Sequence, residues 1–164
     1  MLKEKLKFGV IGCGFWSHYQ VAAWHELPNV ELVAVCDVDL SKAQALADKY
    51  KGVKVYSDVD QMLSTEKIDF VDIISSVATH RQLVEKAAKY NIDIICQKPM
   101  AENPADAEAM MEAVKKAGVK FFIHENFRFQ APIRRLKQIL DDGTIGKPFK
   151  ANLRFCCSFP VFDN

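Results

Sequence analysis

Short apolar runs alternate along the chain with segments whose apolar residues recur every three or four positions. The runs predict buried strands at residues 7–11, 30–36, 54–56, 69–74, 92–96 and 119–124. The segments between them predict amphipathic helices, including one over 16–27 and one that begins at Asn103 and ends at Gly118. Strands that alternate with helices are typical of right-handed crossovers. Residues 1–124 are therefore expected to form an α/β domain with a doubly wound parallel sheet.

Three polar residues are expected to cap helices. Asn103 stands directly before Pro104, and proline is favoured at the first helical position. Thr79, followed three residues later by Gln82, matches the capping box, which predicts that a helix begins at Thr79. Asp39 is the expected cap of the helix that follows the second strand.

The last forty or so residues follow a different pattern, because one amphipathic helix near 133–140 is followed by an aromatic strand candidate at 147–162. A lone strand cannot bury its own faces, since a domain needs at least two packed layers. The strand is expected to pair with another chain, or the sequence is the front part of a longer protein. Left uncovered, its phenylalanines would favour self-association: Phe149, Phe155, Phe159 and Phe162.

Composition narrows the class of protein. Apolar residues make up 49% and charged residues 26%, as in ordinary globular proteins. A net charge of +1 without a basic cluster argues against a nucleic-acid partner. No apolar run approaches the ~20 residues of a membrane span, so no membrane partner is expected. The five cysteines form no C-x-x-C pair, which predicts a cytoplasmic protein without disulfides, structural zinc or another bound metal.

The first strand runs into a glycine turn, GCGFWS at 12–17. Gly12 suits a tight turn from strand to helix, and Gly14 allows the backbone to approach a pyrophosphate closely. Ser17 stands where the third glycine of G-x-G-x-x-G is usual, and a small residue suffices there. The following helix offers unpaired N–H groups to phosphates. A turn in this context predicts dinucleotide binding, with a plain turn that binds no ligand as the alternative.

An acidic residue, Asp37, ends the second strand 23 positions after Gly14. Its carboxylate could accept hydrogen bonds from a ribose diol and would repel a 2′-phosphate, which favours NAD over NADP. Lys42 lies close to Asp37 in sequence, and its positive charge weakens this preference, so NADP remains an alternative cofactor. In a second interpretation Asp37 caps the next helix or binds nothing. A methyltransferase would show the same glycine turn and acidic residue, with adenosylmethionine as the ligand.

Two later segments, QKPMAENPADAEAMMEAVKKAG at 97–118 and HENFRF at 124–129, separate these alternatives. Together with the glycine turn they resemble the N-terminal part of the Gfo/Idh/MocA family of nicotinamide-dependent sugar oxidoreductases, from Phe8 to the last residue. The resemblance implies an NAD(P)-binding Rossmann domain over 1–124 and the beginning of a truncated α+β second domain over 125–164. It also implies hydride transfer between the nicotinamide and a hydroxyl of a small-molecule sugar or polyol.

The resemblance assigns the chemistry to Lys98. The family's Glu-Lys-Pro appears here as Gln97-Lys98-Pro99, and the lysine of that motif lies near the nicotinamide and the reacting hydroxyl. Independently, Lys98 leaves the carboxyl end of a central strand, where its charge could stabilise an alkoxide or relay a proton. Gln97 can still hydrogen-bond the nicotinamide ribose but cannot offset the charge of Lys98, and Pro99 completes the cofactor-side motif.

Further cofactor contacts are expected from two other motifs. Ser75 and Ser76 stand in the family's segment after the fourth strand, beside the ribose and nicotinamide. His80 falls on the histidine of that motif, and a structural role is the alternative for it. Phe15 and Trp16 belong to the glycine turn and are assigned to the cofactor with it.

Asn126 and Arg128 match the family's segment that faces the substrate, although Arg128 could instead pack between domains. In the family the second domain adds a histidine that acts as acid or base, together with the oligomer surface. This chain is therefore expected to bind cofactor with little or no turnover, and to form a homo-oligomer through its second-domain strand. The alternatives are a non-catalytic dinucleotide-binding module and, less favoured, a methyltransferase-type Rossmann domain.

Overall fold

The computed structural model describes residues 5–154 and 156. The chain divides into two compact units, Met1–Glu125 and Asn126–Asn164. No helix within the described ranges combines the length and the apolar character needed to cross a membrane.

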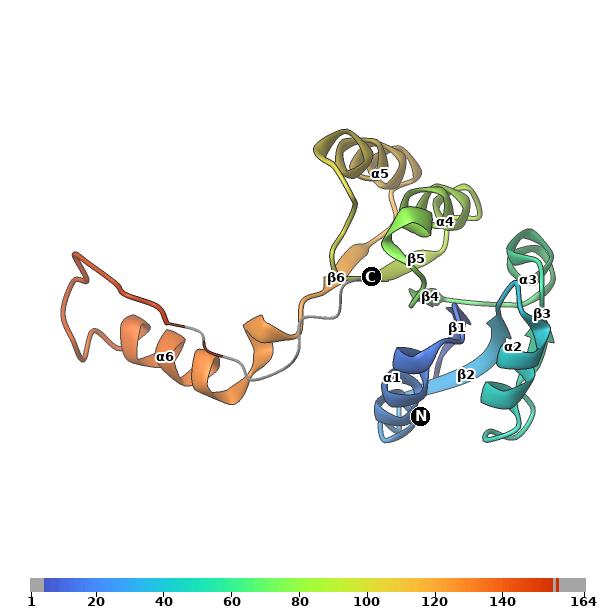
Figure 1. The fold of residues 1–164 in the computed structure, drawn as a ribbon, viewed down its shortest axis with the longest axis horizontal. Helices are drawn as coiled ribbons and strands as arrows, with labels where there is room; N and C mark the ends of the chain where they lie inside the picture. Colours follow the sequence, from blue (N-terminus) through green and yellow to red (C-terminus); the bar gives the residue numbers. More distant parts are fainter. Residues whose placement is uncertain (1–4, 155, 157–164) are drawn as a thin grey trace. The chain divides into compact units, whose positions relative to one another are not determined.

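Strands and helices alternate through the whole of the first unit (Figure 1). In chain order they are β1 Leu6–Ile11, α1 Phe15–His25, β2 Val30–Cys36, α2 Leu40–Ala47, β3 Lys54–Tyr56, α3 Val59–Thr65, β4 Phe70–Ile73, α4 Val77–Lys89, β5 Asp93–Gln97, α5 Pro104–Ala117 and β6 Phe121–His124. Each strand predicted from the apolar runs is present, and its ends lie within two residues of the prediction.

The six strands form one parallel sheet in the order β3-β2-β1-β4-β5-β6. The chain moves outward from β1 to β3 and then returns to build the other half from β4 to β6. The predicted doubly wound sheet is confirmed. The reversal of direction places a topological switch point between β1 and β4, and such sheets bind ligands at the carboxyl edge there.

Both faces of the sheet are covered, and strand alternation decides which residues each face buries. One face packs under α3, α4 and α5, with Ile73 and Ile94 at its centre. The other face packs under α1 and α2, where the ring of Phe8 stacks on that of Phe70 with centroids 5.1 Å apart. Asp72 lies between two residues of the first face, so it belongs to the face under α1.

Two of the three predicted caps are confirmed. Asn103 Oδ1 accepts a hydrogen bond from the backbone N of Asp106 at 2.9 Å, at the start of α5. Asp39 Oδ1 accepts one from the backbone N of Ser41 at 3.0 Å, at the start of α2. Gly118 ends α5 in the left-handed conformation, with φ of 71°.

The predicted helix start at Thr79 is wrong, because α4 begins at Val77 with Ser76 as its N-cap. The Thr79 hydroxyl donates to the Ser76 carbonyl and lies 2.8 Å from the Ser75 hydroxyl. It therefore bonds back to the turn that precedes it, a local bond that competes with capping.

The described residues of the second unit form a 3₁₀ turn, η1 Phe127–Phe129, and one helix, α6 Ala131–Asp141. The helix includes the predicted residues 133–140, and none of its residues is buried within the described structure. The predicted strand at 147–162 differs: residues 147–154 and 156 carry no strand, and the remainder lies outside the described residues. A strand requires a hydrogen-bonded neighbour, which the described residues of this unit do not offer. Phe149 is 99% exposed, whereas Phe155, Phe159 and Phe162 lie outside the described residues.

Candidate functional site

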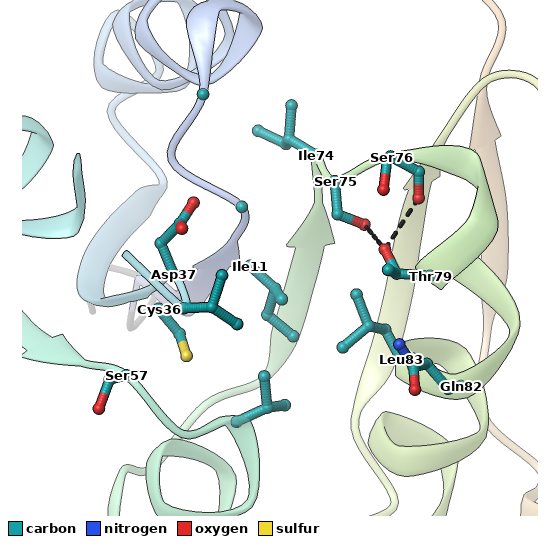
Figure 2. A pocket seen from close by; sticks show the side chains of 14 residues that line it. Ile11, Cys36, Asp37, Ser57, Ile74, Ser75, Ser76, Thr79, Gln82 and Leu83 are labelled. Atoms are coloured by element: carbon teal, nitrogen blue, oxygen red, sulfur yellow. Dashed lines mark hydrogen bonds between the residues drawn. The ribbon is translucent and has the colours of Figure 1, made fainter. Parts of the chain in front are cut away.

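A cleft of about 320 Å³ lies at the carboxyl edge of the sheet, at the switch point between β1 and β4 (Figure 2). The turns after β1, β2 and β4 form its walls together with the first turns of α3 and α4. Five residues predicted from the sequence to bind a dinucleotide line it: Gly12, Gly14, Asp37, Ser75 and Ser76.

Gly12 brings the turn after β1 close to the turn after β4. Its φ of +96° lies in a region that other residues rarely adopt. A Cβ at this position would lie 2.7 Å from the carbonyl oxygen of Ile74 and 2.9 Å from the backbone N of Ser75. Only glycine therefore allows the two turns to form adjacent walls of the cleft.

Gly14 serves a different purpose. It is the N-cap of α1, and no side chain caps the helix there. Its φ is an ordinary −77°, and no atom lies within 4 Å of the place a Cβ would occupy, so a side chain would project into open space at the cleft. Ser17 is fully buried, and its hydroxyl donates to the Gly14 carbonyl at 2.6 Å.

The start of α1 suits an anion. The first N–H groups of any helix lack intrahelical partners, and the helix dipole makes this end positive. The first turn of α1 contains no acidic residue. A bare glycine at the N-cap and an open cleft beside it leave space for a pyrophosphate, so the donor set fits the dinucleotide predicted from the sequence.

Asp37 is held at the cleft by two backbone N–H groups. Its Oδ2 accepts from Cys13 at 2.7 Å and its Oδ1 accepts from Asp39 at 2.9 Å. Asp39, and not Asp37, caps α2. Lys42, which left NADP open, has its ammonium 3.8 Å from the Asp39 carboxylate.

His80 lies in α4 and is not among the residues that line the cleft. The ring is 1% exposed, with Nε2 3.2 Å from the Ser75 carbonyl oxygen. Its Nδ1 lies 3.0 Å from the Pro99 carbonyl oxygen and 3.3 Å from that of Met100. His80 thus links the turn after β4 to the loop after β5.

The predicted catalytic motif lies where β5 ends: Gln97 is the last residue of the strand, and Lys98 and Pro99 begin the following loop. This is the same edge of the sheet as the cleft, but none of the three residues lines the cleft. The Lys98 side chain is exposed, and its peptide bond to Pro99 is cis. Gln97 is half-buried, and its Oε1 accepts from the backbone N of Lys98 at 2.9 Å.

Phe15 and Trp16 begin α1 and are 66% and 63% exposed, outside the lining of the cleft. Their rings pack edge to face, and both contact the exposed ring of Tyr19. Asn126 and Arg128 belong to the second unit, where Asn126 precedes η1 and Arg128 lies within it.

Several cleft residues were not predicted from the sequence. Ser57 follows β3, and Thr79 and Gln82 lie in the first turns of α4. In Figure 2 the Thr79 hydroxyl connects to Ser75 and Ser76 on the β4 side. Ser57 could have been predicted from its position directly after a strand, because every strand of a parallel sheet ends at the same edge.

A second missed feature is the buried carboxylate of Asp72, 0% exposed, in β4. Burial raises its pKa to about 6, and the hydrogen bonds from Trp24 and Gln20 oppose that rise. Its signal in the sequence was an acidic residue in the middle of the apolar strand DFVDII, where an unpartnered charge would be costly.

Comparison with known proteins agrees with this geometry. The model of a family described as "Oxidoreductase family, NAD-binding Rossmann fold" matches residues 6–125. A D-apiose dehydrogenase from Paraburkholderia graminis is 42% identical over 159 residues, which cover 97% of this chain and 42% of that protein. A myo-inositol 2-dehydrogenase from Thermotoga maritima is 33% identical over 143 residues, which cover 87% of this chain and 43% of that protein.

A solved structure is similar over the same region. The crystal structure of an oxidoreductase from Agrobacterium radiobacter, in complex with NAD+, L-tartaric acid and magnesium, superposes with a TM-score of 0.85 at 38% identity. The match covers 88% of this chain and 42% of that one. The chain thus spans less than half the length of each of these three proteins.

Proposed function

The chain belongs to the Gfo/Idh/MocA oxidoreductase family, which has an NAD-binding Rossmann fold, and from this membership we propose that the cleft between β1 and β4 binds NAD. The observation that carries the proposal is the pairing of Gly14, bare at the start of α1, with the fixed carboxylate of Asp37 across the same cleft. The methyltransferase alternative has no support from the family match.

Each wall of the cleft has a part in the proposed binding. The N–H groups at the start of α1 hold the pyrophosphate, and Asp37 accepts from the hydroxyls of the adenosine ribose. Ser75 and Ser76 contact the other half of the dinucleotide. Because a carboxylate repels a 2′-phosphate and Lys42 already pairs with Asp39, NAD is preferred to NADP.

We further propose that the family's redox chemistry uses Lys98. NAD, when bound, supplies a hydride acceptor for the oxidation of a secondary alcohol. As a neutral amine Lys98 takes the hydroxyl proton while the hydride leaves the carbinol carbon, and the ammonium so formed hydrogen-bonds the substrate oxygen and later releases the proton to solvent. Gln97 orients the backbone of Lys98. A sugar or polyol is the proposed substrate class, in keeping with the two dehydrogenases named above, and Asn126 and Arg128 are its proposed contacts.

The 164 residues by themselves are proposed to bind NAD(H) with little or no turnover, since they correspond to less than half of each relative. They are also proposed to self-associate through the second unit, where Phe149 and the apolar side of α6 are exposed. Size-exclusion chromatography coupled to light scattering tests this, and a clean monomer at every concentration would contradict it.

Calorimetric titration with NADH, NADPH and adenosylmethionine tests the binding proposal. NADH is expected to bind more tightly than NADPH, and adenosylmethionine is expected to give no heat beyond dilution. Tighter binding of adenosylmethionine than of NADH would overturn the proposal. A parallel assay of NAD reduction with D-apiose and with myo-inositol separates a competent dehydrogenase from a dinucleotide-binding module.

A further inference from the structure

A connected set of hydrogen bonds runs beneath α1 from the buried carboxylate of Asp72 to the backbone of Lys98. Trp24 Nε1 donates to Asp72 at 2.8 Å. Gln20 Nε2 donates to the two Asp72 oxygens at 3.1 and 3.3 Å. Gln20 is itself 8% exposed, so it is buried together with Asp72, while Trp24 is only partly buried.

The orientation of the Gln20 amide follows from its partners. An ionised carboxylate only accepts hydrogen bonds, so the nitrogen of the amide has to face Asp72. The same nitrogen lies 2.8 Å from Nδ1 of His124, which accepts its second hydrogen. The amide oxygen of Gln20 is therefore left for a different neighbour, and Gln97 Nε2 donates to it at 2.5 Å.

Strand register explains why these side chains meet. Gln97 of β5 is paired directly with His124 of β6, so the two side chains are neighbours on one face of the sheet. Asp72 is paired with Ile95, two residues before Gln97 and on the same face. That face lies under α1, which supplies Gln20 and Trp24 from successive turns.

Both polar atoms of the Gln97 side-chain amide form hydrogen bonds. Its nitrogen donates to Gln20, and its oxygen accepts from the backbone N of Lys98. A glutamate, which the family motif has at this position, would turn a carboxylate oxygen toward the Gln20 carbonyl. Two acceptors would then face each other beneath α1, a mismatch that costs about as much as an unsatisfied buried group.

From this geometry we infer that Gln20 is a positioning residue: oriented by Asp72, it requires an amide at position 97, and through that amide it fixes the backbone of Lys98. The expected effect on cofactor binding rests on the proposed function, which places Lys98 beside the nicotinamide. The hydrogen-bond network itself is independent of that function.

The test compares Gln97→Glu with the double variant Gln20→Lys/Gln97→Glu. A lysine at position 20 would donate both to Asp72 and to the new carboxylate, which removes the mismatch. Gln61→Glu, the same change on an exposed residue of α3, is the matched control. All proteins are studied at about pH 8, where Asp72 is ionised and its orientation of Gln20 is in force.

Two readouts are needed. The first is the amide signal of Lys98 in an NMR spectrum without cofactor, which is expected to move in Gln97→Glu, to return toward the parent position in the double variant, and to stay unmoved in Gln61→Glu. The second is NADH affinity, which is expected to fall about tenfold in Gln97→Glu and to recover to within about threefold of the parent in the double variant.

Acidification supplies an independent signature. At about pH 5 a glutamate at position 97 can hold a proton and donate to Gln20, so Gln97→Glu is expected to regain NADH affinity relative to the parent measured at the same pH. Asp72 and His124 are the ionisable side chains of the network itself, and the buried Cys96 lies beside Asp72. Below about pH 6 Asp72 is protonated as well and no longer requires the nitrogen of Gln20 to face it, so either proton relieves the mismatch in Gln97→Glu, and the difference between the two pH profiles reports that relief.

The inference is overturned if the Lys98 amide signal stays unmoved in Gln97→Glu, or if the two substitutions are simply additive in the double variant. Gln20→Met, which keeps the side-chain length and removes both hydrogen-bonding groups, is expected to move the same signal and covers the case in which Gln97→Glu does not fold. If the parent itself fails to bind NADH, the proposed function fails, and the NMR comparison still decides the inference.

Discussion

The carboxylate of Asp37 accepts a hydrogen bond from the backbone N–H of Cys13, with 2.7 Å between Oδ2 and the nitrogen. This bond joins the end of β2 to the middle of the glycine turn after β1. The other carboxylate oxygen is held by the N–H of Asp39. Two backbone donors thus fix the orientation of the carboxylate at the cleft, which preorganises it for the proposed contact with the ribose.

Replacement of Asp37 by asparagine is expected to weaken NADH binding by about tenfold or more. An amide has a single oxygen, so it cannot accept from Cys13 and Asp39 on both sides as the carboxylate does. The preference for NADH over NADPH should shrink as well, because the negative charge is lost. Titrations that follow cofactor fluorescence measure both effects, with Asp48→Asn at the other end of α2 as the control. Unchanged NADH affinity in Asp37→Asn would remove the carboxylate from the site.

Substitution by alanine is expected to change the free energy of unfolding at one glycine of the turn and not at the other. Gly12→Ala should lower the free energy of unfolding by about 3 kcal/mol, because a Cβ would meet the backbone of Ile74 and Ser75 at a positive φ. Gly14→Ala should leave stability within about 0.5 kcal/mol, since open space surrounds that position.

Cofactor affinity provides the second half of this comparison. Gly14→Ala should weaken NADH binding despite its normal stability, because the added methyl group would occupy the space proposed for the pyrophosphate. Urea unfolding and NADH titration of the same samples separate the effects. A Gly14→Ala protein that binds NADH as the parent does would show that the cofactor does not approach this backbone.

Most of the fold was predictable because its signals are local. A buried parallel strand is a short apolar run, and each run between 7 and 124 lies where a strand forms. The caps at Asn103 and Asp39 were equally local, since a short polar side chain bonds an N–H two or three residues away. The cleft followed from topology, because the glycine turn and Asp37 both stand at strand ends that meet at one edge.

What was missed depends on residues far apart in sequence. Gln20, Asp72, Gln97 and His124 come from four elements, and only the register of β4, β5 and β6 shows that they touch. The helix start at Thr79 failed because a threonine hydroxyl can bond backward as well as cap, and the local pattern is the same for both. The strand predicted within 147–162 required a partner strand, which no local pattern supplies.

The buried thiols are expected to resist alkylation in the folded protein. Burial raises the pKa of Cys13, Cys36 and Cys96 to about 12, so at about pH 8 they are protonated as well as inaccessible. Cys156 is exposed and should react with iodoacetamide within minutes. Peptide mass spectrometry before and after unfolding in guanidinium chloride measures this. Rapid labelling of Cys13 in the native protein would mean that the glycine turn opens.

Asp72 should make stability fall as pH rises through about 6. Burial raises its pKa from 3.8 to about 6, so the native state holds a proton that the unfolded chain has already lost. This stabilisation is on the order of 3 kcal/mol. It is fully present below about pH 4 and is lost by neutral pH. Asp72→Asn cannot titrate, so the free energy of unfolding should vary less between pH 4 and 7 in this variant, even though the amide fits Gln20 poorly and lowers stability throughout. Urea unfolding at several pH values compares the two slopes, and equal slopes would show that the carboxylate is ionised in the native protein at the same pH as in the unfolded chain.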